Sequence, residues 1–242
     1  MTKSEILTIM TGGMACIAGS VLAVYASLGI PVEYLLTASF MAAPGSFVVS
    51  KILYPEDSKP ATSTLEKINQ VTIKKEKNII EAILDGAMNG AKISFGIIAM
   101  LIAFISLVAL FNKILFLINH SLSLKLILGW LFTPLVGLFG VQACDIGTVA
   151  QLFGTKLSLN EFIAYLDLAK LIHQKAINKD SIAIATFLLC GFANFGSIAI
   201  QVGGLSQMAP ERKSDFAALG FKAMICGALV SCISACIVGI IL

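Results

Sequence analysis

The chain has 242 residues, of which 57% are hydrophobic and 13% are charged, and its mean hydropathy is +0.92. A soluble domain does not tolerate so apolar a composition on its surface, so we expect a protein of the lipid bilayer. The formal net charge of +3 is small and predicts no nucleic-acid partner. The six cysteines lie in apolar segments without metal-ligand spacing, which predicts reduced thiols.

Four apolar stretches are long enough to cross a hydrocarbon core of about 30 Å, which needs about 20 helical residues. They cover residues 5–28, 32–54, 93–119 and 217–242. A fifth stretch, 181–207, is interrupted by polar residues and glycines. The fold class predicted from this pattern is an all-α polytopic membrane protein with about five transmembrane helices, one of them interrupted.

The segment 56–92 differs abruptly because it is rich in lysines and acids. Its apolar residues nevertheless keep helical spacing, and Ser63 with Glu66 fits a capping box. This pattern predicts an interfacial amphipathic helix with its linker. The alternative is a solvated linker that only tolerates helix.

Residues 120–168 contain two apolar arms that are too short for two independent spans. Glycine, proline and charged residues interrupt them, and irregular backbone at membrane depth requires burial in protein or a cavity. We therefore expect a re-entrant helical hairpin over 120–168. With this topology eleven of the 17 basic residues share one side, so the positive-inside rule places the loop 55–92 in the cytoplasm and the C-terminus outside.

Glu161 is the first candidate functional residue. A charged side chain at bilayer depth costs about 2.5–3.5 kcal/mol on insertion scales, so an intramembrane carboxylate indicates function by default. Asn160 and Glu161 follow the helix-breaking FGTK, where we expect the second arm of the hairpin to begin and to face a cavity. The alternative is a carboxylate at the water interface, paired with Lys156 five residues earlier.

A second candidate is the segment LLCGFANFGSIAIQVGG, 188–204, in the interrupted span. Its glycines loosen the helix around Phe192, Asn194 and Ser197, which together offer an aromatic face, an amide and a hydroxyl to a polar, ring-bearing ligand. The alternative is that the amide and the hydroxyl bond to a neighbouring helix and the ring fills the core. The sequence has no GxSxG, P-loop or HExxH motif, so we expect no enzyme and no metal.

Three segments, in the same order and over essentially the whole chain, resemble the concentrative nucleoside transporters. They are GGMACIAGSVLAVYASLGIPVEYLLTASFMAAPG (12–45), GTKLSLNEFIAYLDL (154–168) and CGFANFGSIAIQVGGLSQMAPER (190–212). The resemblance implies a homotrimer in the cell membrane, in bacteria the inner membrane, that carries nucleosides inward with protons or sodium. It also implies inverted repeats, with 1–55 completing the first repeat and 93–242 forming the second.

The family's site residues map onto this sequence individually. The resemblance implies that Glu161, Asn194 and Ser197 bond the ribose hydroxyls, that Phe192 lines the pocket and that Val21 packs against the base. It places a cation site at Cys16 and Ile17, without a cofactor. Sodium-coupled members usually have serine where Cys16 stands, and thiol is a poor ligand for hard sodium, so the coupling cation is H+ or Na+.

The family's first hairpin carries a Gly-(Gln or Asn)-(Thr or Ser)-Glu-x-Pro tip that reads the base, and no segment here matches it. We therefore expect the C-terminal portion of a symporter, with the ribose-binding half of the site. Two alternatives are a split-gene subunit that assembles with a separately encoded N-terminal piece, and a degraded remnant. A membrane enzyme that uses Glu161 or Asp145 as an acid or base is a third reading.

Overall fold

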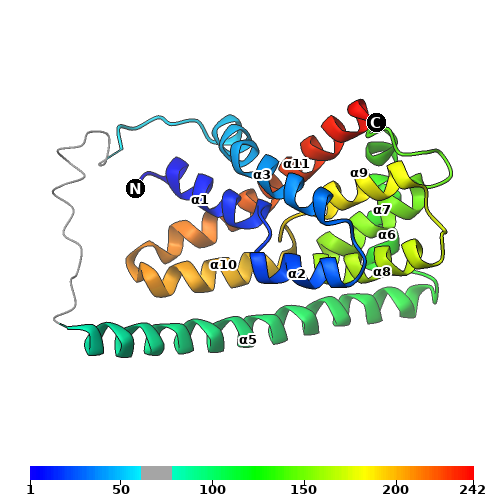
Figure 1. The fold of residues 1–242 in the computed structure, drawn as a ribbon. Coiled ribbons are helices and arrows are strands. Elements are labelled where there is room, and N and C mark those ends of the chain that lie inside the picture. The colour runs from blue at the N-terminus through cyan, green and yellow to red at the C-terminus, as the bar shows by residue number, and fades with distance from the viewer. Residues whose placement is uncertain (61–77) are drawn as a thin grey trace.

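The structure is a computed structural model that describes residues 1–60 and 78–242, without the side chains of residues 97, 100, 101 and 104. The described residues form helices and no β-strand (Figure 1). In chain order the elements are α1 (Lys3–Ala15), α2 (Gly19–Ser27), α3 (Val32–Leu53), α5 (Ile79–Ile118), α6 (Leu124–Gly137), α7 (Ile146–Ser158), α8 (Glu161–His173), α9 (Lys179–Leu189), α10 (Phe195–Met208), the 3₁₀ turn η1 (Pro210–Arg212) and α11 (Lys213–Ile241).

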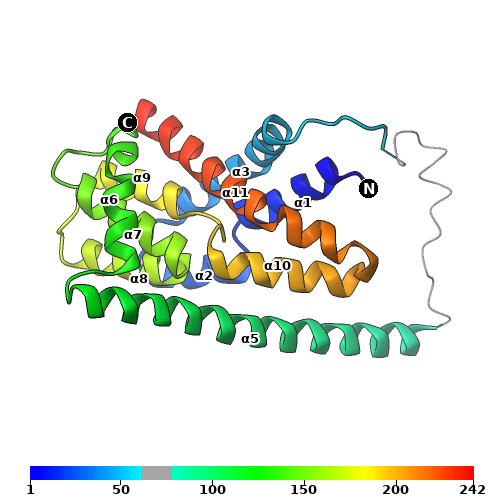
Figure 2. The same ribbon diagram turned by 180° about the vertical axis from the view of Figure 1, so that it is seen from behind.

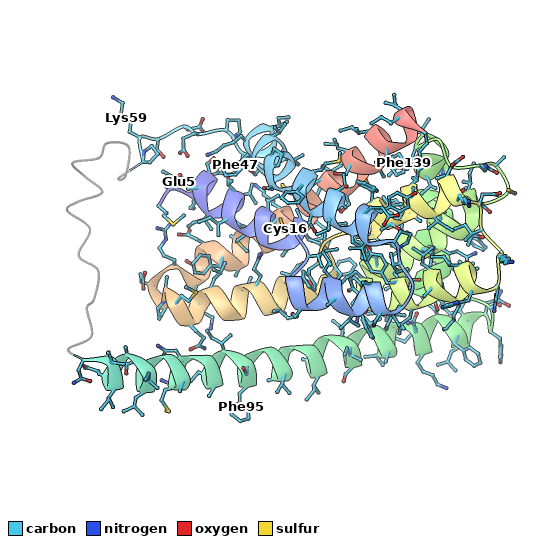
Figure 3. The ribbon with its side chains drawn as sticks, viewed as in Figure 1. Glu5, Cys16, Phe47, Lys59, Phe95 and Phe139 are labelled. Carbon is cyan, nitrogen blue, oxygen red and sulfur yellow. The ribbon has the colours of Figure 1, made fainter. Side chains whose placement is uncertain are left out.

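The first predicted span is broken. The prediction of one helix over 5–28 is wrong, because α1 ends at Ala15 and α2 begins at Gly19. Between them Cys16 has an extended backbone, with φ −92° and ψ 157°, and Figure 3 labels it where the two helices meet. The local sequence contains no proline at this point, and the end of α1 packs against the distant Gly191.

Two other spans agree with their predictions. Helix α3 (Val32–Leu53) matches the predicted 32–54 to within one residue and continues through Pro44. Helix α11 (Lys213–Ile241) begins four residues before the predicted 217–242 and ends one residue earlier. Within the described chain, three stretches are long and apolar enough to cross a membrane: Lys3–Ser27, Val32–Leu53 and Pro210–Ile241. The all-helical class is therefore confirmed, and the number of about five transmembrane helices stays a prediction.

Helix α5 has 40 residues and crosses the predicted boundary between 56–92 and 93–119. Its first turn is capped by Asn78, whose side chain accepts a hydrogen bond from the Glu81 amide. Residues 79–92 are thus part of one long helix, and a separate amphipathic helix ending at 92 is wrong for that portion. The remainder of that prediction, including the capping box, falls at 61–77, outside the residues that the structure describes.

Helix α5 forms one side of the molecule. It extends along α2, α8 and α10 in Figure 1, and the view from behind in Figure 2 shows it as a nearly straight rod beside α10. Much of its outward face is apolar and exposed; Phe95 is 74% exposed, and its ring points away from the other helices in Figure 3. Such a surface fits contact with lipid or with another subunit.

The region 120–168 contains three helices rather than two arms. Helices α6 and α7 pack against each other as a hairpin, and α8 begins at Glu161 after a break at Leu159. The second arm therefore begins at Ile146, and the expectation that it begins near Asn160 is wrong. Glu161 instead begins the helix that follows the hairpin. That this hairpin re-enters a membrane stays a prediction.

The interruption predicted within 181–207 is present. Helix α9 ends at Leu189 and α10 begins at Phe195. Gly191, between them, has φ +85°, a conformation that side chains with a Cβ rarely adopt. A Cβ at this position would overlap the Ala15 carbonyl oxygen and lie 2.6 Å from that of Met14. The break between α9 and α10 therefore packs directly on the break between α1 and α2.

Candidate functional site

Two helices begin side by side at the candidate site. The Asn160 side-chain oxygen accepts a 2.9 Å hydrogen bond from the Ile163 amide at the start of α8. The Asn194 side-chain oxygen accepts a 2.8 Å bond from the Ser197 amide at the start of α10. Asparagine is a favoured N-cap because its oxygen satisfies a first-turn amide. Both helices present their positive ends to the same space.

This space is a cavity of about 230 Å³. It brings together four of the residues predicted from the sequence: Glu161, Phe192, Asn194 and Ser197. Helix α5 closes one wall with Ile105 and Val108, and the remaining lining residues are Ser158, Leu159, Asn160, Phe162, Ile163, Gly196 and Ile200. The cavity is thus apolar on most sides, with its polar groups at the two helix starts.

The Glu161 carboxylate is buried in this cavity wall, with 4% of the residue exposed. One of its oxygens accepts a hydrogen bond from the Asn194 side-chain nitrogen at 3.1 Å, and the other accepts from the Tyr25 hydroxyl at 3.3 Å. Because the Asn194 oxygen already accepts the cap bond, its nitrogen has to face Glu161. The hydrogen-bond network therefore fixes the orientation of the amide.

The alternative of a hydrated ion pair between Glu161 and Lys156 does not match the geometry. Lys156 is fully buried, and its ammonium donates to the carbonyls of Leu188 at 2.9 Å and Cys190 at 2.7 Å and to the Ser231 hydroxyl at 2.9 Å. Among the described ion pairs, none joins Lys156 to Glu161. Glu161 is held by uncharged donors.

Three predicted residues lie elsewhere. Val21 and Ile17 are partly buried against the core cluster that contains Tyr25, and Cys16 packs against a second cluster built around α1 and α11. None of the three lines the cavity. In the described part of the chain, no group of three or more His, Cys, Asp or Glu residues could hold a metal ion.

Sequence reasoning missed the hydrogen-bond partners of two buried polar side chains, Tyr25 and Lys156. Tyr25 is fully buried, and its ring stacks on Tyr165 with 4.1 Å between centroids, which leaves its hydroxyl at Glu161. A tyrosine in an apolar span was the available signal, because a buried phenol needs a partner. For Lys156 the available signal was a lysine within an apolar region, because such a charge needs a buried partner.

The comparisons with known proteins agree with this architecture. A family model described as "Na+ dependent nucleoside transporter C-terminus" matches residues 34–239. The nucleoside permease NupC of Helicobacter pylori is 40% identical over 99% of this chain and 58% of its own length. An uncharacterized transporter of Haemophilus influenzae is 43% identical over 99% of this chain and 59% of its length. The human sodium/nucleoside cotransporter 1 is 40% identical over the whole chain and 40% of its length.

Solved structures of the transporter CNTnw have the same fold. An inward-facing, substrate-bound state has a TM-score of 0.80 with 44% identity, covering 99% of this chain and 57% of that chain. A doubly substituted form in an outward-facing state has a TM-score of 0.87 with 42% identity, covering 99% and 58%.

The family model and the solved structures that match this chain all describe membrane transporters. The chain belongs to the nucleoside transporter family that includes NupC and the sodium/nucleoside cotransporters. It spans 58–60% of the length of the bacterial relatives that it matches.

Proposed function

We propose that the cavity between α8 and α10 binds the ribose of a nucleoside, as part of a cation-coupled symporter of the cell membrane. One observation carries this proposal. Side chains from two segments, 158–163 and 192–200, meet around one cavity and place a buried carboxylate, Glu161, beside an amide 33 positions away in the sequence and a hydroxyl.

The chemistry of these groups suits a sugar. Each Glu161 oxygen accepts one side-chain hydrogen bond in this structure, and a carboxylate oxygen can accept a second. Neighbouring ribose hydroxyls would fill these free positions as donors. The Ser197 hydroxyl can donate or accept, and the Phe192 ring offers an apolar face to the sugar or base. The positive ends of α8 and α10 favour the carboxylate as an anion.

Similarity to the two CNTnw states supports a proposal about which conformation this chain adopts. The TM-score is 0.87 for the outward-facing state and 0.80 for the inward-facing, substrate-bound state. These values favour an outward-facing arrangement for this chain. In such a state the proposed substrate would enter from outside the cell.

Binding to the purified chain in detergent micelles tests the proposal. We expect uridine or adenosine to bind and Glu161→Gln to abolish binding, because the amide replaces an acceptor with a donor. Asp167→Asn is the matched control, since Asp167 lies on the same helix but forms surface ion pairs with Lys125 and Lys170. Retained affinity in Glu161→Gln would remove Glu161 from the pocket.

The remaining parts of the proposal need separate measurements. Val21 packing against the base predicts that Val21→Trp weakens the binding of purine nucleosides more than the binding of ribose itself.

A homotrimer predicts a mass three times that of one chain in native mass spectrometry. A cytoplasmic position of the segment around Lys59 predicts that a cysteine placed there reacts with impermeant maleimide only in inverted vesicles.

A further inference from the structure

Lys156 occupies an unusual environment at the end of α7. Its ammonium has three hydrogen-bond acceptors, and one of them, the Ser231 hydroxyl, donates its own proton to the Cys190 carbonyl at 2.7 Å. A neutral amine has two N–H groups and cannot serve three acceptors. The geometry therefore corresponds to a protonated lysine inside the protein.

The two carbonyls bonded to Lys156 come from the end of another helix. Helix α9 ends at Leu189 with Cys190 as its C-cap, so the carbonyls of Leu188 and Cys190 belong to the last turn, which lacks intrahelical partners. This end also carries the negative pole of the helix dipole. Within the described ion pairs no carboxylate accompanies Lys156. Its charge is matched by a helix end.

Two sets of hydrogen bonds connect the region where α7 meets α8 with the region where α9 meets α10. Lys156 joins the end of α7 to the end of α9, and Glu161 joins the start of α8 to Asn194 at the start of α10. The α9–α10 break thus begins at the carbonyls that Lys156 holds and ends at the amide that faces Glu161. Ser231 fixes the first connection to α11 as well.

We propose that Lys156 is a tethered cation that closes the α9–α10 break and thereby positions Asn194 against Glu161. This inference rests on the proposed ribose site for its effect on binding. Three oxygens at a helix C-terminus would also suit a small inorganic cation, but such an ion can dissociate. A covalently attached ammonium keeps the break charged and closed throughout a transport cycle.

The test compares Lys156→Met, which removes the charge, with Lys156→Arg, which keeps it. Lys170→Met is the control, because Lys170 is an exposed lysine on the adjacent helix α8. The first readout is hydrogen–deuterium exchange of the amides of 190–194 in the ligand-free chain, with α3 as internal reference. The second is the ratio of affinities for a ribonucleoside and its 2′,3′-dideoxy analogue, which general destabilisation would leave unchanged.

We expect Lys156→Met to raise exchange across 190–194 by about tenfold and to lower the ribose preference, because the Leu188 carbonyl loses its lysine donor and the Cys190 carbonyl keeps only the Ser231 hydroxyl. Lys156→Arg should restore much of the protection from exchange and much of the ribose preference. Lys170→Met should change neither quantity. Unchanged exchange in Lys156→Met would overturn the inference. If the unmodified chain binds no nucleoside, the proposed function fails, yet the exchange experiment still decides the role of Lys156.

Ser231→Ala gives an independent test should Lys156→Met not fold. It removes one of the three acceptors of Lys156 and one of the two donors to the Cys190 carbonyl, and it leaves the lysine and both carbonyls in place. We expect a smaller, about threefold rise in exchange confined to 190–194. Exchange equal to that of the unsubstituted chain would overturn the inference.

Discussion

The Asn194 side-chain nitrogen donates a hydrogen bond to Glu161 over 3.1 Å, while its oxygen caps helix α10. One asparagine thus couples the start of a helix to the carboxylate in the cavity. Because both ends of the amide are used, its orientation cannot reverse without losing two hydrogen bonds. The oxygen has to accept the cap bond and the nitrogen has to donate to Glu161, so substitutions can test the two roles separately.

Asn194→Asp keeps an oxygen for the cap but replaces the donor with a second carboxylate facing Glu161. Like charges at this distance repel strongly in a buried site, so we expect ribonucleoside binding at neutral pH to fall by about a hundredfold or more. Isothermal titration of the detergent-solubilised chain measures this loss. Asn78→Asp makes the same change at the exposed N-cap of α5 and should leave affinity intact. Comparable affinity in the two variants would contradict the proposed contact.

Tyr25→Phe removes one hydrogen bond to Glu161 and preserves the stacked ring. We expect affinity for ribonucleosides to fall by about fivefold, corresponding to about 1 kcal/mol for one hydrogen bond. Tyr165→Phe is a matched control, because its hydroxyl donates to the Thr186 carbonyl and not to Glu161. That variant should lose stability without a change in ribonucleoside affinity. Equal losses of affinity in both variants would argue against a specific role for the Tyr25 hydroxyl.

Gly191→Ala should open the contact between the two helix breaks. Its φ of +85° disfavours alanine, and the new methyl group would meet the carbonyls of Ala15 and Met14. We expect a loss of about 2 kcal/mol or more in stability, seen as a lower unfolding midpoint in detergent. Gly203→Ala is the control, since a Cβ placed there on α10 meets no atom within 4 Å apart from its own neighbouring helix backbone. It should be neutral or slightly stabilising, and a similar loss in both variants would contradict this account.

Cys16→Ser tests the coupling cation. A hydroxyl oxygen is a better ligand for sodium than a thiol, so we expect nucleoside uptake to reach half its maximum at several-fold lower sodium. Uptake is measured at constant ionic strength and pH, with Cys144→Ser, an exposed thiol, as control. If Cys16→Ser leaves the sodium dependence unchanged, the proposed cation site at Cys16 and Ile17 is wrong.

Much of the architecture was predictable from local composition. Hydropathy and length identified α3 and α11, and the glycines of 188–204 predicted the interruption between α9 and α10. The four residues Glu161, Phe192, Asn194 and Ser197 were selected from the sequence, and the structure gathers them at one cavity. These features succeed because chain-breaking residues and rare polar groups in apolar spans are visible without tertiary information.

The incorrect boundaries share one cause. Nothing between Ala15 and Gly19 breaks a helix locally, and nothing in the charged residues up to Lys92 signals that α5 continues past them. Whether a helix ends or continues at these places depends on the segments that pack against it. Sequence periodicity contains information only about the residues within the segment itself. The role of Lys156 was missed for the same reason, since its acceptors lie 32 to 75 residues away.

The sequence by itself determined that this chain belongs in a membrane, where its spans are interrupted and which polar side chains stand out from an apolar background. Only the tertiary structure decided which of those side chains meet. Burial leaves each polar group without water, so its partner has to be another group brought in by the fold. That requirement directs Lys156 to the end of α9 and leaves Glu161 to Tyr25 and Asn194.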